Sequence, residues 1–163
     1  MRYQPATTQG FVDSMQYGAT RLERDEIEIA AGAPGLLRIV LGSKGARVQI
    51  HLPEDSSPGK TTTWTVILAP AGRGFSPGAG MPMLMGASGT DLSYDNLAPG
   101  RYFVFAVQQS QNFGFNERVF ELVQPRLEAV DIAVGGSPAI TPKLFTSGEI
   151  TRLALAFLQG EYQ

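Results

Sequence analysis

The chain of 163 residues contains no cysteine and only one histidine, His51. Without cysteine it cannot form a disulfide, a thiol nucleophile or a cysteine-ligated zinc site. A serine triad would need His51 as its base, and the serine within GRGFSPGAG lacks the strand–turn–helix context of a catalytic nucleophile. We therefore expect no catalytic set and no cofactor, and we interpret His51 as a solvated surface residue.

Charged residues and long apolar runs are also scarce. Charged residues make up 17% of the chain, against a usual ~25%, and the net charge is -2. A nucleic-acid-binding surface needs a basic face, so no nucleic-acid partner is expected. No run approaches the ~18 apolar residues that span a bilayer, and residues 1–10 lack a secretion-signal pattern. We expect neither a membrane span nor a signal peptide in this chain.

Glycine and proline are abundant instead, with 19 and 11 residues. Together with short alternating apolar runs, they are typical of an antiparallel β-sandwich with frequent turns. Residues 36–41 and 47–52 are expected to form a hairpin, and residues 70–89 to be irregular. Strands are predicted at residues 10–17, 25–30, 36–41, 47–52, 64–70, 101–108, 115–123 and 126–134 and, in preference to a short helix beginning at Ser147, at 149–158.

Three segments resemble the carboxypeptidase regulatory-like family: LRIVLGSKGARVQIHL, WTVILAP and, most specifically, LSYDNLAPGRYFVFAV. The family consists of prealbumin-like (transthyretin-like) sandwiches, related to collagen-adhesin B-type domains, in bacterial multi-module surface proteins. The last segment is similar to the family's L-x-P-G-x-Y signature. In it we expect Leu97 to fill the core and Pro99 and Gly100 to form a turn. Tyr102 should point inward with its hydroxyl on a backbone group.

The resemblance implies an all-β chain with an antiparallel Ig-like or prealbumin-like sandwich at residues 43–134. Residues 1–42 would be flanking strands or the end of a preceding sandwich, and residues 135–163 a C-terminal strand extension. The family context further implies an extracellular or cell-envelope location.

Two apolar segments are candidate contact surfaces. The strand with Phe103 and Phe105 is apolar on both faces, so it is either covered on both sides or lies at an interface. Met81, Met83 and Met85 form either a loop folded over the sandwich edge or an adaptable surface for a partner. The sequence thus predicts a non-catalytic module that serves structure, adhesion or assembly through a protein partner or self-association, including filament-type assembly.

Two alternatives stay open. Phe113 and Phe115 lie in a turn-like stretch and can stack on sugars, which would make the chain a carbohydrate-binding module with a polysaccharide partner. Asp91, Asp95 and Asn96 are close together in an expected turn and supply the oxygen ligands that Ca²⁺ prefers, although no EF-hand loop is present.

Overall fold

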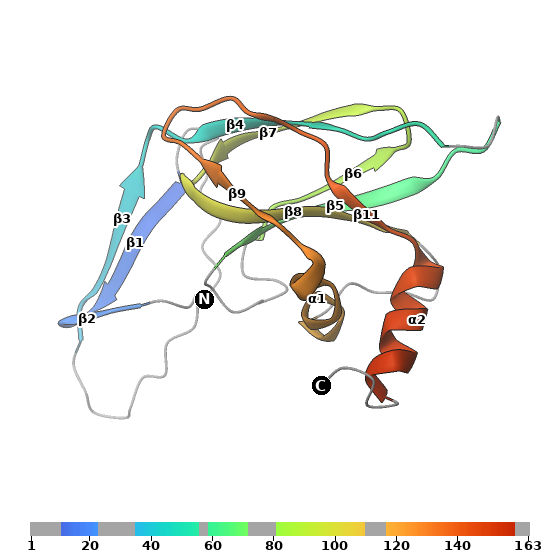
Figure 1. The fold of residues 1–163 in the computed structure, drawn as a ribbon. Helices are drawn as coiled ribbons and strands as arrows, with labels where there is room; N and C mark the ends of the chain where they lie inside the picture. Colours follow the sequence, from blue (N-terminus) through green and yellow to red (C-terminus); the bar gives the residue numbers. More distant parts are fainter. Residues whose placement is uncertain (1–10, 23–34, 56–58, 72–80, 110–116, 159–163) are drawn as a thin grey trace.

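The three-dimensional structure is a computed structural model that describes residues 11–22, 35–55, 59–71, 81–109 and 117–158. In these residues the chain is mainly β, with several antiparallel sheets and two short helices, α1 (Glu117–Val123) and α2 (Ser147–Leu158) (Figure 1). The expectation of a mainly β chain is confirmed. The expectation of an all-β chain is wrong, because both helices are formed by segments predicted as strands.

The first sheet, which we call the arm, consists of β1 (Phe11–Tyr17), β2 (Thr20–Arg21) and β3 (Leu37–Gly42) in the order β2-β1-β3. Gly18 at the β1–β2 turn has a positive φ of 58°, a conformation that glycine adopts without strain. Figure 1 shows the arm extending away from the other sheets at the left of the view. The strands predicted at 10–17 and 36–41 are confirmed, whereas the one predicted at 25–30 lies outside the described residues.

The second sheet has the order β10-β4-β7, formed by β4 (Ala46–His51), β7 (Asp91–Leu97) and β10 (Ala139–Ile140). The predicted hairpin is wrong, because β3 pairs with β1 and β4 pairs with β7. Gly45, between β3 and β4, lies so close to β7 that a Cβ there would be 2.6 Å from the Asn96 Cα. The glycine thus lets the connection press against β7 and turn away from the arm.

The third sheet has the order β11-β8-β5-β6, with β9 also paired to β8. Its strands are β5 (Thr63–Pro70), β6 (Met83–Ala87), β8 (Gly100–Gln108), β9 (Ala129–Ile132) and β11 (Lys143–Phe145). The strands expected at 64–70 and 101–108 are confirmed. The irregular segment expected at 70–89 contains β6, which pairs antiparallel with β5. Two pairs, β10 with β4 and β11 with β8, are parallel.

One apolar cluster combines side chains of the second and third sheets. It contains alternate residues of β4, β5 and β8, together with Leu97, which is 2% exposed. The Tyr102 hydroxyl donates a hydrogen bond to the Ala98 carbonyl oxygen at 2.8 Å. The expected positions of Leu97 in the core and of the Tyr102 hydroxyl on a backbone group are therefore confirmed.

The opposite face of the third sheet is covered by α1 and α2. Val119, Phe120 and Val123 of α1 and Ile150 and Leu153 of α2 share a second buried cluster with residues of β5 and β8. Their spacing of three and four residues is that of a helix whose apolar side faces a sheet. The strands predicted at 115–123 and 149–158 are therefore wrong. The expected C-terminal strand extension is corrected for its described part, residues 135–158, where β10 and β11 are followed by α2.

Candidate interaction surface

The β1–β3 pair of the arm has one apolar face. The cross-strand pairs Val12–Leu41, Met15–Ile39 and Tyr17–Leu37 lie on this face, because paired residues of antiparallel strands share a side of the sheet. Between Val12 and Ser14 the register shifts by one residue. This β-bulge brings Val12 to the same side as Met15 and Tyr17, which strict alternation would not do.

These apolar side chains are not buried within the chain. Leu37, Ile39 and Leu41 are 46%, 37% and 54% exposed, and their partners on β1 are half-buried. An alternating strand normally places its apolar side on a core. We define the apolar arm face as Val12, Met15, Tyr17, Leu37, Ile39 and Leu41. Its three β3 side chains are exposed as in an interaction surface, whereas the three on β1 are half-buried, with the Tyr17 ring lying against Gly35.

The other side of the arm is more polar. It carries the pairs Gln16–Arg38 and Ser14–Val40. Phe11 lies across Gly42 on this side, so close that a Cβ on Gly42 would be 2.3 Å from the Phe11 ring. This side is therefore mixed, since Val40 on it is 37% exposed, and glycine next to an aromatic ring keeps the strands closely packed at the base.

Two apolar strand edges have no paired neighbour among the described residues. β3 pairs only with β1 on its inner side, and β6 pairs only with β5. On β6 the side chains of Met83 and Met85 are 50% and 60% exposed, whereas Met81, just before β6, packs against the cluster beneath the helices. The sequence-predicted methionines are therefore divided between an open sheet edge and the helix-covered core.

Phe103 and Phe105 belong to the helix-covered cluster. Phe105 is fully buried, and its ring centroid lies 6.1 Å from that of Phe120 and 6.3 Å from that of Phe145. Phe103 is half-buried, 6.2 Å from the same Phe120 ring. The strand is thus apolar on both faces because the chain's own helices cover it, so Phe105 offers no surface to a partner. Phe113 and Phe115 lie outside the described residues.

The carboxylates proposed as Ca²⁺ ligands lie on a strand rather than in a turn. Asp91 and Asp95 are four residues apart on one exposed side of β7, about 13 Å at the rise of an extended strand. Ligands of one calcium ion lie only 2.3–2.6 Å from it, so these two carboxylates cannot share an ion. Asn96 occupies the left-handed region with φ 59°. Among the described residues no group of three metal-ligating side chains is present.

Each of these aspartates faces a cationic or titratable partner on β4. Asp95 accepts a hydrogen bond from Arg47 Nε at 2.5 Å, and Asp91 lies 2.6 Å from His51 Nδ1. The hydrogen bond and charge of Asp95 raise the pKa of Arg47 above its ordinary value. All four side chains are more than half exposed, so the outer side of the second sheet is a solvated polar ladder. His51 lies at the surface, as expected from the sequence.

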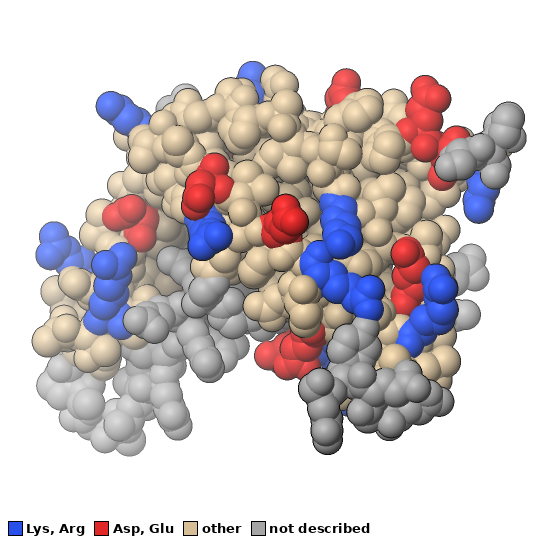
Figure 2. All heavy atoms as spheres, viewed as in Figure 1, with Lys and Arg blue, Asp and Glu red and all other residues tan. Residues whose placement is uncertain are grey.

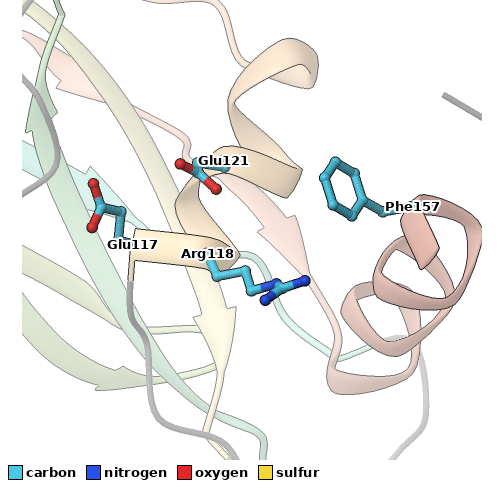
Figure 3. Close-up of a pocket in the computed structure, with 4 residues that line it drawn as sticks. All are labelled: Glu117, Arg118, Glu121 and Phe157. Atoms are coloured by element: carbon cyan, nitrogen blue, oxygen red, sulfur yellow. The ribbon is translucent and has the colours of Figure 1, made fainter. Parts of the chain in front are cut away.

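One hollow lies between the helices and another at the base of the arm, and neither gathers a set of reactive groups. An open hollow of about 510 Å³ lies between α1 and α2 and is lined by Glu117, Arg118, Glu121 and Phe157. Figure 3 shows that Glu117 points away from Phe157, whereas Arg118 extends into the gap between the helices. The charged groups of Glu117 and Arg118 therefore point in different directions. The second hollow, of about 230 Å³, lies at the base of the arm, where β1 meets the ends of β5 and β8.

Comparisons of the chain with protein-family models, with curated proteins and with solved structures find no match. Within the part of the chain that the structure describes, no helix is both long and apolar enough to cross a membrane.

Proposed function

We propose that this protein is a non-catalytic assembly module that binds a second copy of itself through its arm. The observation that carries the proposal is the exposure of Leu37, Ile39 and Leu41, which share one side of β3 and face apolar partners on β1. Contact with another protein surface would remove these side chains from water, which is favourable in proportion to the apolar area buried.

The free energy gained by burying these three side chains is too small to hold two copies together by itself. Fully burying a Leu or Ile side chain contributes about 1.5–3 kcal/mol, so covering the exposed parts of these three contributes roughly 2–4 kcal/mol. Association costs an estimated 4–15 kcal/mol in lost translational and rotational freedom. The apolar arm face alone is therefore too small for a tight complex, and backbone pairing of an open strand edge supplies the additional stabilisation.

A second copy is the favoured partner because each copy carries two apolar edges, β3 and β6, that no other described strand pairs with on their outer sides. β3 is an edge strand with a single charged residue, Arg38, and β6 is an edge strand with none. Natural edge strands are usually blunted by charges, proline, bulges or a covering segment, because unprotected edges pair with other chains.

The proposal extends to the fold family and the setting. The second and third sheets would be the two halves of a prealbumin-like sandwich, which is supported by the apolar cluster that they share. A cell-surface or cell-envelope location is supported by the resemblance of the LSYDNLAPGRYFVFAV segment to bacterial surface modules. In that setting the arm would connect neighbouring subunits.

Sedimentation velocity over a concentration series tests the function. The wild-type chain should associate as its concentration rises, and Ile39→Lys should remain monomeric because a charge would be buried at the contact. Ser14→Lys places the same charge on the more polar side of the arm and should associate like the wild type. Wild-type protein that stays monomeric at every concentration, or a folded Ile39→Lys variant that associates normally, would contradict the proposal.

A further inference from the structure

The two open edges, β3 and β6, lie on different parts of the molecule (Figure 1). We infer that β3 of one copy adds to β6 of the next copy as an antiparallel strand, which extends the third sheet across the subunit boundary. This inference rests on the self-association proposed above and specifies the receiving surface. Strand addition of this kind gains its stability from main-chain hydrogen bonds and its specificity from alternate side chains.

A single contact of this kind protects both exposed apolar edges. A two-fold contact between two β3 strands would cover the arm but leave Met83 and Met85 exposed. It would also bring two copies of Arg38 toward each other. Pairing β3 with β6 covers both edges and joins a strand that carries one cation to a strand that carries no charge.

The side chains of the two strands match in an antiparallel register. If Ile39 lies opposite Met85, then Leu41 lies opposite Met83 and Leu37 opposite Ala87. All of these residues then fall on one side of the joined sheet, because each strand alternates with a period of two. Cross-strand pairs of large apolar side chains contribute to sheet stability, and the methionines adapt to branched neighbours.

Charge distribution favours the antiparallel direction. In this direction Arg38 lies near the end of β6, where Ser88 N–H donates to the Thr62 carbonyl and Thr62 N–H donates to the Asp55 carboxylate at 2.8 Å. The Glu54 side chain is also there, beside Gly89. Figure 2 shows acidic side chains gathered at the upper right, on the end of the body away from the arm. A parallel strand would place Arg38 at the other end of β6.

The contact joins different surfaces of the two copies, so it is heterologous. Each copy keeps one free β3 and one free β6 after the first contact forms. Heterologous contacts close into rings if the rotation per subunit allows it and otherwise continue as filaments.

Complementation of two defective variants tests the pairing. Ile39→Lys disables the β3 edge, and Met85→Lys disables the β6 edge. Each variant alone should therefore remain monomeric. An equimolar mixture should form a heterodimer and nothing larger, because the intact β3 of the Met85→Lys variant can pair with the intact β6 of the Ile39→Lys variant. No further intact edge is then left in the dimer. Mixtures that stay monomeric, or a Met85→Lys variant that assembles normally, would overturn the inference.

Engineered cysteines test the register, since the natural chain contains none. Oxidation of mixed Ile39→Cys and Met85→Cys copies should give a disulfide-linked heterodimer, because directly opposed Cβ atoms lie about 4.5–5.5 Å apart. Val40→Cys, on the other side of β3, should crosslink to Met85→Cys at least tenfold less on a non-reducing gel.

The outcomes separate this inference from the proposed function. Efficient crosslinking of Ile39→Cys copies to one another would overturn the β3–β6 contact in favour of a two-fold arm contact, with self-association intact. If the cysteine variants assemble like the wild type but no disulfide forms between Ile39→Cys and Met85→Cys, the β3–β6 contact is overturned and self-association is not. A chain that is monomeric at every concentration would overturn both.

Discussion

At the start of α2, Thr146 and Glu149 make reciprocal hydrogen bonds. Thr146 N–H donates to Glu149 Oε2 at 2.8 Å, and Glu149 N–H donates to Thr146 Oγ1 at 3.2 Å. Both groups would otherwise be unsatisfied at a helix N-terminus, so this capping box stabilises the first turn. Ser147 N–H also donates to the Gln108 side chain at 3.1 Å, which fixes the helix to the end of β8.

The capping box makes part of the stability dependent on pH. Hydrogen bonds from the Thr146 backbone and hydroxyl lower the pKa of Glu149 below its ordinary value. A carboxyl whose folded pKa is lowered contributes stability above its unfolded pKa and loses it as pH falls through the folded pKa. Glu149→Gln should therefore lower the free energy of unfolding by about 1 kcal/mol at pH 7 and by much less below pH 4.

Urea denaturation of both proteins across this pH range measures the effect. Glu121→Gln, on α1, makes the same change of charge at a surface position and serves as the control. A stability difference for Glu149→Gln that does not change with pH would contradict a role for the carboxylate charge.

Tyr102 shows how far a local motif predicts a single residue. The segment LAPGRY predicted an inward tyrosine with its hydroxyl on a backbone group, and the hydroxyl bonds to Ala98, four residues earlier. Both partners lie in one short segment, so the sequence contains the whole interaction. Asp91 and Asp95 could not be placed in this way, because their partners His51 and Arg47 are 40 and 48 residues distant.

Among the elements, the helices and the third sheet depend on each other. Phe120 on α1 is 4% exposed and lies beside the rings of Phe103 and Phe105. Phe120→Ala should destabilise the protein by about 3–5 kcal/mol, because it removes a buried ring and leaves a cavity. Phe157→Ala removes the same ring from a position that is 52% exposed and should cost much less.

Thermal or urea unfolding of the two variants measures this difference. Equal destabilisation by both substitutions would contradict the conclusion that α1 covers the sheet. A large loss for Phe120→Ala alone would show that the helices are part of the folded core.

The helices were the elements that sequence patterns predicted least well. Residues 149–158 alternate at Leu153, Leu155 and Phe157, which favours a strand. In the structure only Leu153 of these is buried, and the other two are exposed on a helix. The signal that could have identified the helix is the T-x-x-E spacing of Thr146 and Glu149, because a capping box marks a helix start regardless of the alternation that follows.

For the whole molecule, the charges at its two ends are expected to influence assembly. Arg38→Glu should weaken association about fivefold, since an exposed ion pair contributes up to about 1 kcal/mol. Adding Glu54→Lys to the same chain restores opposite charges at the proposed contact and should recover most of the loss. Raising the salt concentration should reduce the difference between the variants, because exposed charges are screened.

Sedimentation equilibrium at low and high salt measures these association constants. The single variant Glu54→Lys is the matched control and should weaken association like Arg38→Glu. Failure of the double variant to recover would contradict the antiparallel direction of the β3–β6 contact.

The sequence by itself determined the mainly β character of the chain and the positions of β1, β3, β4, β5, β8 and, in part, β9. Alternation specifies which side chains of a strand share a side, as in Val48, Ile50 and Leu52, and this property is local. Only the tertiary structure decided which strands pair and which apolar sides are covered. Val48 and Ile39 both belong to apolar strand segments, yet Val48 is fully buried and Ile39 is exposed on the arm. Pairing and burial depend on contacts between residues distant along the chain, and a strand's own sequence does not encode what packs against it.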